Sequence, residues 1–343
     1  MRIAIVNDAA IAAEALRRIL LSVPGYELAW IASDGAEAVQ MCRQDTPDLI
    51  LMDLVMPVMD GAETTRQIMA QTPCAILVVT ATVEGHCAKV FEALGAGALD
   101  AVQTPALAGS GQLQGVSALK FKIDAIGRSP LNDSGNRHPK SGTTERQLLR
   151  SAPSDLLVAI GASAGGPAAL ATILSSLPRD FPAAIIIIQH LDAQFAPSMA
   201  GWLNERSTVS VRVARQDDAP QANTALIAGT NDHLVFLNSQ VLGYTPEPRD
   251  RYYRPSIDVF FESIVRHWRG NAVGTLLTGM GKDGAKGLKG MRDAGYLTIA
   301  QDSASCVVYG MPKAAAELNA AAAILPVDEI ANGLINFVRL SNS

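Results

Sequence analysis

The chain has 343 residues, of which 48% are hydrophobic and only 5% are aromatic. This length suits two domains of about 100–200 residues each, and the abundance of small and aliphatic side chains favours α/β layers over a β-sandwich. The formal net charge is -5, and the Lys and Arg residues are dispersed without a basic stripe, so we expect no nucleic-acid binding.

The cysteines and the N-terminal residues favour a cytoplasmic protein. The four cysteines show neither C-x-x-C spacing nor a histidine at zinc-site spacing, so we expect reduced thiols in a cytoplasmic protein. The N-terminus enters a strand-like pattern directly and lacks the apolar core of a signal peptide. The strongest apolar run, residues 183–188, is too short to span a bilayer. We therefore expect no direct insertion into a membrane.

Residues 1–120 alternate short apolar runs with amphipathic stretches. The strand-like runs lie at residues 3–6, 28–31, 49–52, 76–79 and 99–102. Amphipathic stretches such as 11–21 and 35–43 separate them. This β-α alternation predicts a doubly wound parallel sheet with helices on both faces.

The composition then changes, because Ser, Pro, Asn and Gly become frequent and large apolar residues scarce. We expect a flexible linker over residues 121–152. The β/α alternation resumes in residues 153–343, which we expect to form a second α/β domain with a doubly wound parallel sheet. The expected strands there are 156–160, 185–188 and 273–277; helices follow from Pro167 and near 287–294, and residues 214–243 suggest a hairpin.

Polar residues gather at the carboxyl ends of the strands expected in 1–120. They are Asn7, Asp8, Asp53, Thr80 and Thr104. Ligands bind at this edge of open parallel sheets. Carboxylates on adjacent strands repel each other unless a hard cation such as Mg²⁺ lies between them, and a carboxylate beside Mg²⁺ can attack phosphorus. The alternative is that the aspartates are solvated turn residues.

Residues 51–61, Leu-Met-Asp-Leu-Val-Met-Pro-Val-Met-Asp-Gly, closely resemble the phosphorylation motif of response-regulator receiver domains. The resemblance covers residues 1–120 and implies a flavodoxin-like fold. It implies that Asp53 accepts the phosphoryl group, that Asp8 and Asp53 bind Mg²⁺, and that Thr80 is the switch hydroxyl. A CheA-type histidine kinase is the implied phosphodonor.

Three positions depart from the receiver pattern. Asn7 replaces one of two usual acids, Thr104 replaces a lysine, and Ala101 replaces a frequent aromatic residue. A lysine–phosphoryl contact is a charge-assisted bond worth about 1.5–3 kcal/mol, so we expect weaker coupling between phosphorylation and the switch. The alternative is a pseudo-receiver that docks partners with little phosphoryl control.

In the second half, Gly-Ala-Ser-Ala-Gly-Gly at 161–166 follows an expected strand and opens a helix. A serine on such a turn presents its hydroxyl at the sheet edge, beside backbone N–H groups that can hold an oxyanion. The fragment matches G-x-S-x-G, in which Ser163 is the nucleophile. Taken alone, this Gly/Ser turn could equally bind a phosphate.

Two further strand ends open on the same edge. His190 ends the run at 185–189, and Asp283 lies in a Gly-rich loop between a strand and a helix. Ser163, His190 and Asp283 are therefore expected to form a triad in which the serine attacks, the histidine takes its proton and the aspartate orients the imidazole. The alternatives are a structural histidine and an aspartate that caps a helix. Rival third members of the triad are Asp192, Asp232, Asp258 and Asp302.

The second half also resembles the CheB methylesterase family over almost all of 155–315. The matches include 160–163, Gln189-His190, Arg-Pro-Ser-Ile-Asp at 254–258, 279–285 and 301–313. The resemblance implies a Rossmann-like catalytic domain without a cofactor. It implies hydrolysis of glutamate methyl esters, and deamidation of glutamines, on the cytoplasmic helices of methyl-accepting chemoreceptors.

The family's triad falls on Ser163, His190 and Asp283, and its oxyanion contact falls on the Met280 backbone N–H. Ala164 stands where the family often has Thr. The residues around positions 6–8 and 104–105 look closest to receivers of Wsp-type chemosensory systems. We expect the unphosphorylated receiver to cover the serine site.

Two other functions remain open on the sequence. A nucleotide-binding oxidoreductase would use the 161–166 loop for a pyrophosphate and Asp192 for a ribose, although the spacing is not G-x-G-x-x-G. The second is a docking protein with a decayed hydrolase fold. Such a protein would need none of the three triad residues, so the presence of all three argues against it.

Overall fold

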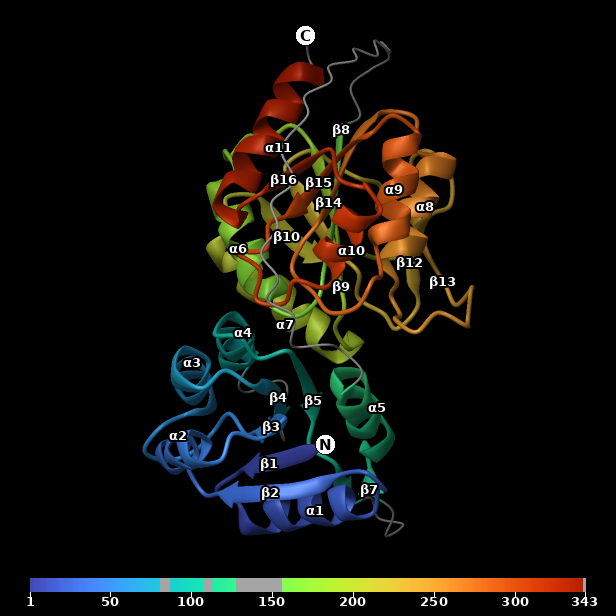
Figure 1. Cartoon of the computed structure of the whole chain (residues 1–343). Coiled ribbons are helices and arrows are strands. Elements are labelled where there is room, and N and C mark those ends of the chain that lie inside the picture. Colours follow the sequence, from blue (N-terminus) through green and yellow to red (C-terminus); the bar gives the residue numbers. More distant parts are fainter. Residues whose placement is uncertain (81–86, 108–112, 128–155, 342–343) are drawn as a thin grey trace.

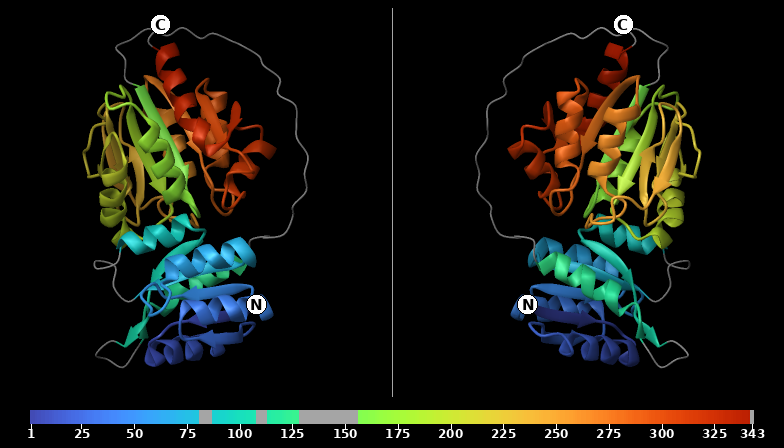
Figure 2. Two further views of the ribbon diagram at one scale, coloured as in Figure 1. Left: turned by 90° about the vertical axis from the view of Figure 1, so that its left-hand side faces the viewer. Right: turned by 90° about the vertical axis from the view of Figure 1, so that its right-hand side faces the viewer.

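The computed structural model describes residues 1–80, 87–107, 113–127 and 156–341. These residues form two α/β domains, stacked so that the receiver-like domain lies below the C-terminal one in Figure 1. The same arrangement appears in the side views of Figure 2. No helix in these ranges combines the length and apolar character needed to cross a bilayer.

The N-terminal domain is a five-stranded parallel sheet in the order β2-β1-β3-β4-β5. This is the flavodoxin-like order, so the expected doubly wound fold is confirmed. The strands are β1 (Arg2–Val6), β2 (Glu27–Ala32), β3 (Leu49–Met52), β4 (Ala75–Thr80) and β5 (Asp100–Gln103). The helices are α1 (Ala10–Leu21), α2 (Gly35–Gln44), α3 (Gly61–Gln71), α4 (Cys87–Gly95) and α5 (Val116–Gly127). A two-stranded antiparallel ribbon, β6 (Ala106–Leu107) with β7 (Leu113–Gln114), precedes α5.

The last helix of this domain corrects the expected linker. Helix α5 runs from Val116 to Gly127, so the boundary expected at residue 120 falls inside a helix. Leu119, Ile123 and Ile126 are buried, at the spacing that places apolar side chains on one helical face. Residues 121–127 are therefore helical, and the remainder of the expected linker, 128–152, lies outside the described residues.

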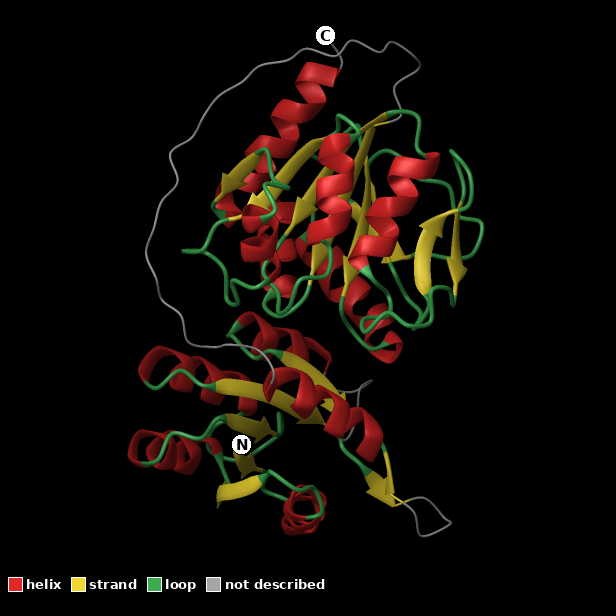
Figure 3. Ribbon diagram, turned by 45° about the vertical axis from the view of Figure 1, so that its right-hand side comes forward, coloured by secondary structure: helices red, strands yellow, loops and turns green. Residues whose placement is uncertain are grey.

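The C-terminal domain is a seven-stranded parallel sheet in the order β10-β11-β9-β8-β14-β15-β16. Its strand order reverses between β8 and β14, as in a Rossmann-like sheet, and helices cover both faces (Figure 3). The strands are β8 (Leu156–Ala162), β9 (Ala184–Gln189), β10 (Ser210–Val213), β11 (Thr224–Ile227), β14 (Asn271–Leu276), β15 (Leu297–Gln301) and β16 (Ala323–Leu325). The expected hairpin is β12 (His233–Phe236) with β13 (Leu242–Thr245).

The helices of the C-terminal domain follow the strands in turn. They are α6 (Gly166–Ser176), the short 3₁₀ helix η1 (Ala193–Phe195), α7 (Ala196–Arg206), α8 (Ile257–His267), α9 (Ala285–Asp293), α10 (Met311–Glu317) and α11 (Val327–Ser341). The wholly buried β8 and β9 explain the long aliphatic runs in the sequence, because a parallel sheet covered on both faces needs apolar side chains on both.

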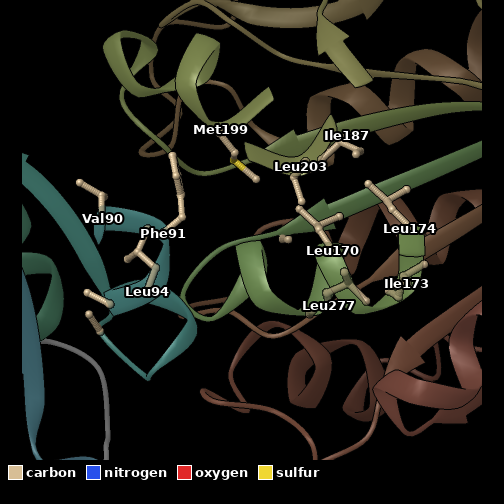
Figure 4. Close-up of a cluster of buried hydrophobic side chains, with 14 of the residues drawn as sticks. Val90, Phe91, Leu94, Leu170, Ile173, Leu174, Ile187, Met199, Leu203 and Leu277 are labelled. Atoms are coloured by element: carbon tan, nitrogen blue, oxygen red, sulfur yellow. The ribbon is translucent and has the colours of Figure 1, made fainter. Parts of the chain in front are cut away.

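The two domains share a packed apolar interface. Helix α4 of the receiver-like domain faces α6 and α7 of the C-terminal domain, as Figure 4 shows for Val90, Phe91 and Leu94. The ring of Phe91 lies 5.6 Å from that of Trp202 on α7. The helices touch closely at one further point, because a Cβ atom at Gly95 would lie 3.5 Å from the Cβ of Ala168.

Candidate active site

Ser163 lies in the tight turn between β8 and α6. Its backbone N–H donates to the Thr278 carbonyl (3.1 Å), and its carbonyl accepts from the Gly166 N–H (2.8 Å) and from Gln189 Nε2 (2.9 Å). Gly165 takes φ +76°, a left-handed conformation that glycine adopts without strain. Three neighbouring strands therefore fix the position of Ser163, as its place at a strand end predicted.

Close packing around Ser163 requires glycine at position 279. A Cβ atom there would lie 2.7 Å from Ser163 Cβ and 2.5 Å from Met311 Sδ. The Gly279 carbonyl also accepts hydrogen bonds from the N–H groups of Gly310 (3.1 Å) and Met311 (2.9 Å). The Gly-rich loop after β14 is thus held against the serine turn.

His190 follows β9, the neighbour of β8, and meets Asp283 from the loop after β14. Its Nε2 lies 2.8 Å from Asp283 Oδ2, and the two side chains are only 7% and 10% exposed. Because a carboxylate only accepts hydrogen bonds, Nε2 carries the hydrogen and Nδ1 of the neutral ring is the acceptor. This Nδ1 is buried and has no hydrogen-bond partner among the described residues. The ring is reversed relative to serine proteases, in which the aspartate bonds Nδ1.

Asp283 is held by the N-terminus of α8. Its carboxylate accepts from Ser256 Oγ (2.8 Å), from the Ile257 N–H (2.7 Å) and from the Asp258 N–H (3.2 Å). Burial opposes ionisation, but the bonds with His190 and these donors outweigh it, so the pKa of Asp283 lies below its ordinary value. A carboxylate at a helix N-terminus also interacts favourably with the helix dipole.

The alternative that Asp283 caps its own helix is wrong, since Gly284 occupies the cap position of α9. The four rival aspartates each have other partners. These are Gln194 N–H for Asp192, Arg254 for Asp232, Gly287 N–H for Asp258 and Ser305 for Asp302. Asp283 is the aspartate that bonds His190 in the described part of the chain.

Three residues at the site had no role assigned from the sequence. Tyr253 stacks on His190, with ring centroids 4.1 Å apart and an interplanar angle of 4°. Ser256 bonds Asp283, and the buried His233 accepts from the Ser256 N–H through Nδ1 (3.0 Å). The motif at 254–258 was the available signal for Ser256, whereas no sequence pattern indicates the Tyr253 stack.

Met280, the expected oxyanion residue, lies in the loop after β14 and is 8% exposed. It lines one cavity with Ser163 and His190. The backbone around it is fixed, because the Gly279 N–H donates to the Val308 carbonyl (3.0 Å) and Gly281 adopts φ +86°. Its oxyanion role stays a prediction.

This cavity, of about 460 Å³, is lined by both domains. The receiver-like domain contributes Asp100 of β5, Leu99 just before it, and residues of α5 that include Lys122 and Ile126. Lys122 Nζ pairs with Asp100 Oδ2 at 2.6 Å beside the opening. In this arrangement the receiver-like domain lies directly over the serine site.

The expected phosphorylation site lies at the carboxyl ends of β1, β3 and β4. Asn7 and Asp8 follow β1, Asp53 follows the adjacent β3, and Thr80 ends β4. The Asn7 amide oxygen accepts from the Ala9 N–H (2.9 Å), and Asp53 Oδ1 accepts from the Leu54 N–H (2.7 Å).

This donor set fits Mg²⁺, which commonly binds through one or two carboxylates and keeps several waters. Asp8 and Asp53 supply two carboxylates from adjacent strands. The described ranges hold no metal-binding group of three or more His, Cys, Asp or Glu residues. With Asn7 in place of an acid, the metal would depend on these two carboxylates.

Comparisons with known proteins agree with both halves of the chain. A CheB methylesterase family model matches residues 158–334, and a response regulator receiver domain model matches residues 3–109. A protein-glutamate methylesterase/protein-glutamine glutaminase of Mesorhizobium japonicum is 53% identical over 98% of each chain. One from Pseudomonas aeruginosa is 54% identical over 96% of this chain and 98% of its own. The solved Thermotoga maritima CheB methylesterase catalytic domain matches with TM-score 0.51 and 33% identity, covering 53% of this chain and 98% of that one.

Proposed function

Because the chain belongs to the CheB methylesterase family, we propose that Ser163, His190 and Asp283 hydrolyse glutamate methyl esters on chemoreceptors. The protein is a protein-glutamate methylesterase and protein-glutamine glutaminase with an N-terminal receiver domain. Family membership rules out the oxidoreductase alternative. The observation that carries the triad is the His190–Asp283 bond at 2.8 Å, which leaves a buried Nδ1 at the cavity shared with Ser163.

The reaction is acyl transfer in two steps. Ser163 Oγ attacks the ester carbonyl while His190 Nδ1 takes its proton, and the Met280 N–H stabilises the oxyanion. The proton passes to the departing methoxide, so methanol leaves and a glutamyl ester of Ser163 remains. Water then attacks this ester with His190 again as the base, which frees the glutamate and the serine. A glutamine side chain follows the same course with ammonia as the leaving group.

Asp283 keeps its charge throughout these steps. Its pKa lies below the ordinary value, so the carboxylate stays ionised and stabilises the imidazolium that forms on His190. Ala164 supplies no hydroxyl to the imidazole, which we expect to lower the rate without abolishing it.

Phosphorylation of the receiver controls the esterase. We propose that Asp53 accepts a phosphoryl group from a CheA-type histidine kinase and that the Thr80 hydroxyl reports its presence. Asp8 and Asp53 would hold Mg²⁺, which neutralises the charge of the phosphoryl oxygens when bound. The unphosphorylated receiver blocks the cavity with residues of β5 and α5, while α4 packs against the C-terminal domain. Phosphorylation loosens this contact. Thr104 and Asn7 are expected to weaken this coupling. The start of the C-terminal domain at residue 153 and the Wsp-type branch remain predictions.

Methanol release from methylated receptor membranes tests this function. The full chain is incubated with the membranes with and without a small-molecule phosphodonor, beside Ser163→Ala. We expect release by the wild type, faster with the phosphodonor, and none above background from the variant. No release by the wild type in the presence of phosphodonor and Mg²⁺ would reject the proposal.

A further inference from the structure

The parallel stack of Tyr253 on His190 has no role in the steps above. Tyr253 precedes α8 in the segment that also carries Ser256, so one short stretch of chain contacts both His190 and Asp283. The centroid distance of 4.1 Å and the angle of 4° place the two rings face to face.

The position of Tyr253 is fixed from its other side. A Cβ atom at Gly281 would lie 3.4 Å from Tyr253 Oη, so the phenol packs against the loop that carries Met280 and Asp283. Tyr252 meets the Tyr253 ring edge-on, with centroids 4.9 Å apart and planes at 80°. Burial raises the pKa of Tyr253, so its ring remains a neutral phenol at physiological pH.

A neutral aromatic face attracts a cation, because the π-system presents negative potential. His190 becomes a cation whenever it holds the proton of Ser163. Asp283 lies in the plane of the imidazole at Nε2, whereas Tyr253 covers its face. One contact meets the edge of the ring and the other its face, so together they restrain both the direction and the plane of the imidazole.

We propose that Tyr253 is a positioning residue, which holds the plane of His190 and stabilises the imidazolium formed during acyl transfer. The proposal rests on the proposed function of the same site. It differs from a packing role in one respect: the loss of the ring face changes the protonation of the base as well as the rate.

Several other charged groups surround this pair. Asp283 bonds the imidazole, and Asp192, Arg254, Asp100 and Lys122 line the same cavity from the C-terminal domain and the receiver. Their contribution is common to the wild type and to variants at position 253, so a comparison among these proteins isolates the ring.

The test compares Tyr253→Leu and Tyr253→Phe in the full chain with phosphodonor present. We expect Tyr253→Leu to lower kcat for methanol release about tenfold, which is about 1.4 kcal/mol, with KM within twofold. Tyr253→Phe keeps the ring face and retains kcat within twofold. Tyr296→Leu is the matched control, because Tyr296 precedes β15 at the opposite edge of the sheet and bonds the Trp268 carbonyl.

The second readout is the pH dependence of Ser163 labelling by a fluorophosphonate, which needs no receptor. Without the ring, neutral imidazole is favoured, so the acidic limb of the labelling rate moves to lower pH in Tyr253→Leu. Fluorinated phenylalanines at position 253 keep the shape but weaken the negative face, and they move the limb the same way in order of fluorination. This series keeps the test decisive if Tyr253→Leu fails to fold.

An unchanged acidic limb across the fluorinated series, or wild-type kcat in a folded Tyr253→Leu protein, would overturn the inference. A wild-type chain that neither releases methanol nor reacts at Ser163 would instead overturn the proposed function. The two failures are therefore distinguishable.

Discussion

A charge placed between α4 and α6 should release the esterase from its receiver. Ala168 on α6 faces Gly95 of α4, where an added Cβ atom would lie 3.5 Å from the Ala168 Cβ, at ordinary van der Waals distance. The two helices therefore leave little space between them at this point. Ala168 is half-buried, so Ala168→Glu would place a partly buried carboxylate against α4, and Lys89 of α4 is already paired with Asp60 at 3.0 Å. A partly buried charge without a partner costs about 2 kcal/mol, which shifts the closed–open equilibrium about thirtyfold.

The assay is methanol release without phosphodonor. We expect Ala168→Glu to raise this basal rate to about the level that the wild type reaches with phosphodonor, and to respond little to further phosphorylation. Thr172→Glu is the matched control, because it places the same charge one turn along α6 on an exposed position. Equal basal rates for the two folded variants and the wild type would refute the inhibitory role of this interface.

Four further outcomes follow from the structure. Ser163→Ala should lower methanol release by several orders of magnitude, and a loss of less than tenfold would remove the serine from its role. Ser256→Ala deletes the 2.8 Å hydrogen bond from Ser256 Oγ to the Asp283 carboxylate, and a bond to a charged group is worth about 1.5–3 kcal/mol. We therefore expect kcat to fall tenfold or more in Ser256→Ala and to be restored in Ser256→Thr. A kcat within twofold of the wild type for the alanine variant would contradict this. Asp53→Asn should abolish activation by the phosphodonor while basal methanol release stays unchanged, and a chelator that removes Mg²⁺ should do the same to the wild type. Activation that persists in Asp53→Asn would place the phosphorylation elsewhere. Burial raises the pKa of Asp258 from 3.8 to about 6, so the cost of its ionisation to folding is complete above pH 6 and disappears toward pH 4. Asp258→Asn should therefore raise the free energy of unfolding by about 1 kcal/mol at pH 8 and by less at pH 5. Urea unfolding curves that give the same increment at both pH values would refute this.

The fold, and the placement of Ser163, His190 and Asp283 at one edge of the sheet, were predictable because the carboxyl ends of parallel strands lie at a common edge. Long aliphatic runs such as β9 identified buried strands, and the residues after them had to lie at one edge of the sheet. Ser163, His190 and Asp283 were proposed as a triad on this ground, and the structure brings His190 and Asp283 within 2.8 Å.

The details of that site were beyond sequence patterns. Which imidazole nitrogen meets Asp283 depends on side-chain rotation, and the Tyr253 stack depends on the path of a loop without regular structure. Ser256 belongs to a recognised motif, but its bond to Asp283 appears only once α8 is placed against the loop after β14.

Helix α5 was underestimated for a different reason. Its C-terminal turn has few large apolar residues, so by composition Ile123 and Ile126 resemble the Ser- and Gly-rich stretch that follows. These residues are buried by tertiary packing, which composition does not reveal. Composition alone therefore placed the end of the domain several residues too early.

The most direct test of the account is to map where a fluorophosphonate reacts with the full chain, by mass spectrometry, with and without a phosphodonor. We predict one adduct, on Ser163, which forms faster with phosphodonor and is lost in His190→Gln. An adduct on another residue, or a labelling rate that neither the phosphodonor nor the loss of His190 alters, would contradict a receiver-gated serine esterase.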